Sequence, residues 1–183
     1  MSLILNLLSF YIPERVKNKR IYELFKVTAD AFNLKMPKFD LNKISREKLL
    51  KEYALFTKEK TTSFIKTYGI DSKEITELKS RLYESSYEMG KKIKKNLKIK
   101  DSEEILKVMK LIYKIIRIDF EEGKNGVVII NNCFFSSYYN QDICMVISSL
   151  DEGLAAGISG GCKLAFFQRI TSGKDFCSAH FNL

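Results

Sequence analysis

The first 132 residues of this 183-residue chain contain no cysteine, and the whole chain contains a single histidine. The cysteines are Cys133, Cys144, Cys162 and Cys177, and the histidine is His180. No two cysteines form a C-x-x-C pair, the short spacing that four-cysteine zinc and iron–sulfur sites normally use. The sequence therefore does not favour a four-cysteine cluster. Any chemistry of thiol or imidazole groups lies in the C-terminal part of the chain.

The N-terminus lacks the features of an export signal. The opening stretch MSLILNLLSFYIP is apolar, but no basic segment precedes it, no small-residue cleavage site follows it, and it is too short to span a bilayer. We therefore expect a docking segment, no membrane partner, and a cytoplasmic, reducing location. In that environment cysteines are thiols or metal ligands and not disulfides.

Arginine is scarce among the basic residues, with 6 Arg beside 25 Lys, although the formal net charge is +9. Of these 31 basic residues 28 precede Val127, together with 18 of the 22 acidic ones. A basic face can bind nucleic acid. Here the lysines alternate with glutamates at helical spacing, as in KEYALFTKEK and SKEITELKSR, which is typical of a solvated helix surface. We therefore expect no nucleic-acid partner.

Residues 1–114 are predicted to be mainly helical. Apolar residues recur at helical spacing in four segments of this part. The segments start near Pro13, Ser45, Asp71 and Asp101. Ser45 is a candidate N-cap, and Asp71 and Asp101 are each followed three residues later by a glutamate, as in a capping box.

The spacing of apolar residues changes near Ile115 from a period of 3.6 to a period of 2, which indicates strands. IIRIDFEEGKNGVVIINN predicts one hairpin, and KLAFFQRITSGKDFCSAHF predicts a second hairpin with its turn at SGKD. Residues 140–156 between them are expected to form one inserted helix. The chain is thus predicted to be a single α+β domain over residues 1–183. A four-helix N-terminal part packs on a four-stranded antiparallel sheet, and residues 115–183 hold the sheet and the inserted helix.

A turn at SGKD fixes the register of the closing hairpin. It pairs Thr171 with Phe176, and alternation then places Gln168 and Cys177 on one face and His180 on the other. Cys177 and His180 therefore do not form a dyad within one regular strand.

The same register separates the cysteines. Cys162 lies eight residues before Ile170, the predicted partner of Cys177, or roughly 26 Å along the strand. Cys133 ends a predicted strand and Cys144 lies on the inserted helix, so these two and Cys177 are the three that can meet. They are buried core residues, a nucleophilic thiol site, or ligands of a metal ion.

Other polar residues of this part have an ordinary interpretation beside a functional one. Arg169 either holds a carboxylate or is solvated. Gln168 either finds a hydrogen-bond partner in the core or lines a pocket. His180, Asp151 and Glu152 are either surface residues or a general acid and base.

The stretches NNCFFSSYYNQDICMV and FFQRITSGKDFCSAHF, separated by a helix with acidic residues, resemble the C-terminal half of the L-2-amino-thiazoline-4-carboxylic acid hydrolase family. The matching positions are Cys133, Cys144, Arg169, Gly173 and Cys177. YALFTKE and LYESSYEMGKKIKKNL are similar to its helical half. The closing hairpin is more distantly similar to 4-vinyl-reductase-type domains, which bind small molecules or metals.

The resemblance implies hydrolysis of a C–N bond in a small, sulfur-containing heterocycle. A thiolate or a metal-held water would attack, an acid would protonate the leaving nitrogen, and Arg169 would fix a substrate carboxylate. The candidate catalytic residues are Cys133, Cys144, Cys177, Asp151 and His180. The candidate substrate-binding residues are Arg169 and Gln168. If a metal ion is the cofactor, the three cysteines are its ligands. The alternative is a non-enzymatic module that binds a small molecule or a metal. The substrate, the cofactor and the oligomeric state stay open, and a homo-oligomer is one of the alternatives.

Overall fold

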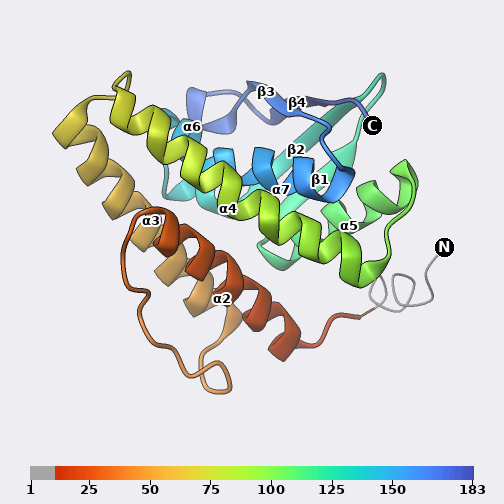
Figure 1. Cartoon of the computed structure of the whole chain (residues 1–183), viewed down its shortest axis with the longest axis horizontal. Helices are drawn as coiled ribbons and strands as arrows, with labels where there is room; N and C mark the ends of the chain where they lie inside the picture. Colours follow the sequence, from red (N-terminus) through yellow and green to blue (C-terminus); the bar gives the residue numbers. More distant parts are fainter. Residues whose placement is uncertain (1–10) are drawn as a thin grey trace.

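The computed structural model describes residues 11–183 (Figure 1). Most of the predicted docking segment lies outside this part. The helices are α2 (Glu14–Ala31), α3 (Arg46–Tyr68), α4 (Lys73–Leu97), α5 (Ser102–Ile115), α6 (Gln141–Ile147) and α7 (Ser149–Ser159). The strands are β1 (Ile118–Glu122), β2 (Val127–Cys133), β3 (Leu164–Gln168) and β4 (Cys177–Phe181). Within the described residues no helix has the length and apolar character needed to cross a membrane.

The four predicted N-terminal helices are confirmed as α2 to α5. Ser45 caps α3 by accepting a hydrogen bond from the Lys48 amide, and Asp101 caps α5 in the same way. The predicted cap of α4 is wrong by one residue. Ser72, and not Asp71, has the extended backbone of an N-cap and accepts from the helix amides.

The α+β prediction is confirmed, because the strands form one antiparallel sheet in the order β1-β2-β4-β3. Alternate residues of the two central strands, such as Val128 and Ala179, are buried on one face of it. Helix α5 packs on β1, and α7 packs on both β3 and α4 (Figure 1). The cysteine-bearing ends of β2 and β4 therefore lie close to α6 and α7, the two helices inserted between the hairpins.

The inserted segment is two helices, where one was predicted. Ser148 ends α6 and begins α7, and α7 continues to Ser159, beyond the predicted end at residue 156. The Ser148 hydroxyl donates a hydrogen bond to the carbonyl oxygen of Met145, at 3.2 Å. Such bonding to the preceding turn competes with regular helix hydrogen bonding and bends helices, which accounts for the break.

The predicted register of the closing hairpin is wrong by two residues. Phe166 lies opposite Ala179 and not opposite Phe181. The reason is that β3 stops at Gln168 and the next residues form a 3-10 turn, so the connection is longer than SGKD. A shift of two keeps Phe166 on the same face as Cys177, but an irregularity after Phe166 places Gln168 opposite Ser178, on the other face.

Helices α4 and α7 touch through three glycines, which we call the glycine seam: Gly90, Gly153 and Gly157. A Cβ atom on Gly157 would lie 2.2 Å from the carbonyl oxygen of Tyr87, and one on Gly153 would lie 2.1 Å from that of Tyr83. No side chain fits between the two backbones at these places. The seam therefore fixes where α7, and any functional residue on it, sits against α4.

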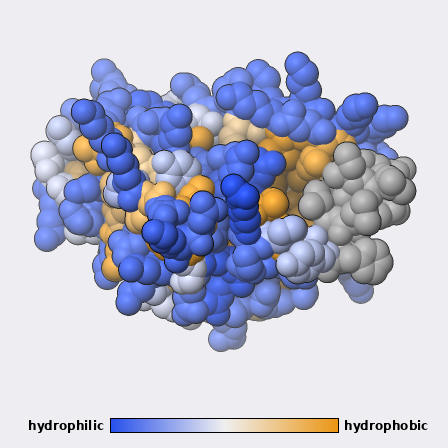
Figure 2. Space-filling view, turned by 90° about the horizontal axis from the view of Figure 1, so that it is seen from below, coloured by the Kyte–Doolittle hydropathy of each residue, from blue (hydrophilic) through white to orange (hydrophobic). Residues whose placement is uncertain are grey.

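Several lysines on the helices pair with glutamates one turn away. Lys91 is 2.8 Å from Glu88, and Lys17 is 2.6 Å from Glu14. Hydrophilic residues cover most of the face shown in Figure 2 and surround smaller hydrophobic patches. This pattern agrees with the interpretation of the lysine-rich helices as solvated surfaces.

Candidate functional site

Three of the four cysteines line one cavity of about 80 Å³ between the sheet and the helices. Cys133 comes from the end of β2, Cys144 from α6, and Cys177 from the start of β4. Cys162 is not among the lining residues, and its amide donates to the hydroxyl oxygen of Ser159 at 2.9 Å. The hairpin brings Cys177 into the cavity because alternate residues of β4 face the helices.

Arg169 is the cation of this cavity. Its Nη2 donates to the Ser148 hydroxyl at 3.1 Å, and its Nη1 lies 3.9 Å from the sulfur of Cys144. The guanidinium also lies over the ring of Phe166, 4.6 Å from its centre. A guanidinium has five N–H donors, so these contacts leave donors for a bound anion.

Asp151 is the acidic group of the cavity. It lies on α7, and its Oδ1 accepts a hydrogen bond from the Tyr113 hydroxyl at 2.9 Å. Burial raises the pKa of Asp151 to about 6, although the Tyr113 hydrogen bond and the charge of Arg169 act to lower it. A carboxyl with a pKa near neutrality can both give and take a proton at physiological pH.

Two of the thiols are held in their protonated form. Burial raises the pKa of Cys133 to about 12, and burial also raises the pKa of Cys177. The Cys177 sulfur in addition accepts from the Ile170 amide at 3.2 Å. The Cys144 sulfur lies 3.9 Å from Nη1 of Arg169. Nucleophilic cysteines in proteins commonly sit in such electropositive surroundings.

Metal ligation by Cys133, Cys144 and Cys177 stays a prediction. Within residues 11–183, no group of three His, Cys, Asp or Glu side chains is placed to hold a metal ion. The side chain of Arg169 takes the place beside Cys144, and the Ile170 amide contacts Cys177, so both sulfurs face hydrogen-bond donors.

Three other predicted site residues lie outside the cavity. His180 is exposed on the opposite face of the sheet, where its ring lies tilted against that of Phe167, with the ring centres 4.7 Å apart. Gln168 donates to the carbonyl oxygen of Phe176, a contact within the hairpin loop that follows from the register described above. Glu152 is half-buried on α7 but does not line this cavity.

The structure adds residues that the sequence patterns did not indicate. The hydroxyl groups among them come from distant elements: Tyr53, Tyr113, Ser136, Tyr139, Ser148 and Thr171. The Thr171 hydroxyl oxygen is buried and has no hydrogen-bond partner among the described residues. No local sequence signal marks any of these, because they meet only through tertiary packing.

No protein-family model matches this chain, and no curated protein matches its sequence significantly.

Proposed function

We propose that this protein hydrolyses a C–N bond in a small substrate that carries a carboxylate. The observation that supports this function is that one small cavity holds a cation, a thiol beside it, and a carboxyl with a pKa near neutrality. These are Arg169, Cys144 and Asp151. The resemblance of the two C-terminal stretches to the aminothiazoline-carboxylate hydrolases supports the same reaction class.

In the proposed reaction Cys144 is the nucleophile. The Asp151 carboxylate takes the proton of the Cys144 thiol as the sulfur bonds to the electrophilic carbon, the C–N bond breaks, and Asp151 gives this proton to the leaving nitrogen. A water molecule then attacks the thioester-like intermediate, and one of its protons passes through Asp151 to the departing Cys144 sulfur. The Tyr113 hydroxyl holds the Asp151 carboxyl in place throughout.

Arg169 and Thr171 are the proposed carboxylate-binding pair. Arg169 keeps N–H donors beyond those directed at Ser148 and Cys144, and Thr171 has a buried hydroxyl without a partner. A buried polar group without a partner costs stability, so a ligand that supplies one gains affinity there. A substrate carboxylate is such a ligand, since it accepts from both groups.

A non-enzymatic small-molecule-binding module is the second candidate. It is favoured by the raised pKa values of Cys133 and Cys177, which make these two thiols poor nucleophiles. In that case the same Arg169 and Thr171 would hold the ligand, and no bond would break.

The test uses 2-amino-thiazoline-4-carboxylate as the substrate and follows its loss by liquid chromatography and mass spectrometry. Wild-type protein is compared with Cys144→Ala, Asp151→Asn and Arg169→Met. We expect turnover by the wild type and its loss in the first two variants. In the third, binding by calorimetry should weaken at least tenfold, because the charge-assisted bonds to the carboxylate are removed.

Cys162→Ala is the matched control, since Cys162 does not line the cavity. It should retain wild-type turnover. Full turnover by Cys144→Ala would refute the nucleophile assignment. Binding of the compound by the wild type without any loss of substrate would instead favour the binding module.

A further inference from the structure

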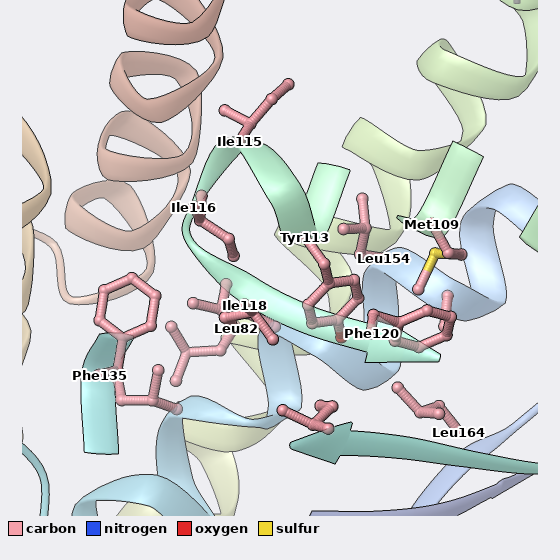
Figure 3. Close-up of a cluster of buried hydrophobic side chains, with 14 of the residues drawn as sticks. Leu82, Met109, Tyr113, Ile115, Ile116, Ile118, Phe120, Phe135, Leu154 and Leu164 are labelled. Atoms are coloured by element: carbon pink, nitrogen blue, oxygen red, sulfur yellow. The ribbon is translucent and has the colours of Figure 1, made fainter. Parts of the chain in front are cut away.

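A second cavity, of about 120 Å³, adjoins the first. Five residues line both cavities: Leu24, Tyr113, Ile116, Leu150 and Asp151. The Tyr113–Asp151 hydrogen bond therefore stands at the junction between them. In Figure 3 Tyr113 lies among side chains of α5, α7 and β1, with Leu154 and Phe120 beside it.

The second cavity has a different chemical character from the first. Its walls are apolar side chains of α2, α4, α5 and α7, such as Ile93 and Ile112. Apart from Tyr113 and Asp151, the charged or hydroxyl-bearing residues lining it are Arg20 and Glu23, which are 2.7 Å apart and pair with each other. A cavity of similar volume with apolar walls stays dry and binds small apolar molecules.

We propose that the two cavities form one bipartite site, and that its ligand is an N-acylated amino acid with a short aliphatic acyl chain. The proposal rests on the proposed function, whose substrate class it names. The amino-acid carboxylate binds to Arg169 and Thr171 in the first cavity, and the acyl chain lies in the second. The amide C–N bond then lies near the junction, where Asp151 is placed.

The chemistry of the step balances without a further reactant. The Asp151 carboxylate takes the Cys144 thiol proton as the sulfur bonds to the acyl carbon, the C–N bond breaks, and the amino acid leaves with that proton. Water then cleaves the thioester to a carboxylic acid, and its second proton returns through Asp151 to the Cys144 sulfur. The apolar second cavity contributes binding energy and holds the acyl carbon in position.

The experiment measures binding of N-acylglycines with acetyl to octanoyl chains by calorimetry, on the full chain. Burial of each methylene is expected to tighten the dissociation constant about fourfold, until the second cavity is full. Ile112→Trp and Ile93→Trp each fill the second cavity and should remove this gain. Ile65→Trp is the control, because Ile65 is half-buried on α3 and lines neither cavity.

The outcomes separate this inference from the hydrolase proposal. A chain-length gain without hydrolysis would support the bipartite site and refute the enzyme. Affinity that does not depend on chain length, or a gain that survives in both tryptophan variants, would overturn the bipartite site. Turnover of aminothiazoline carboxylate would in that case still support the hydrolase.

Discussion

Replacing Gly157 with alanine should destabilise the protein, although alanine is the better helix former. In an exposed helix position the change from glycine to alanine stabilises by about 1 kcal/mol. At Gly157 the new Cβ atom would lie 2.2 Å from the Tyr87 carbonyl oxygen and 3.0 Å from the Cα of Gly90. Both neighbours are backbone, so α4 and α7 must move apart by about 1 Å to reach ordinary contact distance, and overpacking of this kind costs about 1–3 kcal/mol or more.

We therefore expect Gly157→Ala to lower the free energy of unfolding by about 2 kcal/mol, measured by urea titration with circular dichroism. The reference is a pair of variants at an exposed position of α4, Glu84→Gly and Glu84→Ala. There alanine should be more stable than glycine. If Gly157→Ala is stabilising to the same extent as that pair, the glycine seam is not tightly packed and the reasoning fails.

Three further predictions concern charge and thiols. Because the pKa of Asp151 is raised to about 6 in the folded protein, the native state keeps a proton that the unfolded chain has lost. The wild type should therefore lose about 3 kcal/mol of stability relative to Asp151→Asn between about pH 4 and pH 7. Parallel unfolding profiles of the two proteins would contradict this. Iodoacetamide should modify Cys133 and Cys177 far more slowly in the native protein than in urea, since burial raises both pKa values; equal rates by peptide mass spectrometry would show that both thiols are accessible. Labelled DNA or RNA should show no tight binding in fluorescence anisotropy, because lysines alternate with glutamates along the helices and several of them form ion pairs; tight binding that is lost steeply with added salt would contradict the charge argument.

The helices were predictable because their signals are local. Ser45 and Asp101 cap helices through contacts with amides three residues away, and the change of period near Ile115 marks the first strand closely. The hairpin register was less predictable, since Ile170 and its neighbours form a 3-10 turn and no short turn motif in the sequence predicts it. That turn also decided the place of Gln168.

The candidate site was predictable only in part. Cys133, Cys144 and Cys177 could be grouped from strand and helix positions alone, since residues at the ends of neighbouring strands meet the following helix. The residues that give the cavity its chemistry could not be predicted from the sequence. Tyr113 and Asp151 are 38 positions apart in the sequence and meet only in the folded chain. The Thr171 hydroxyl has no hydrogen-bond partner among the described residues, and only the positions of its neighbours in the fold show this.

The hydrogen bond from Arg169 to Ser148 ties the closing hairpin to the joint between α6 and α7. Cys144 precedes this joint and Asp151 follows it, so one side chain restrains the backbone that carries both groups. An anion that draws the guanidinium away from Ser148 would release the joint, and the amides of Ser148 and Glu152, which form the last hydrogen bond before it and the first after it, would exchange with solvent faster. An anion that uses the remaining donors would leave their exchange slow. Amide exchange at the joint between α6 and α7 would then report how the cavity is occupied, whether or not a bond is broken inside it.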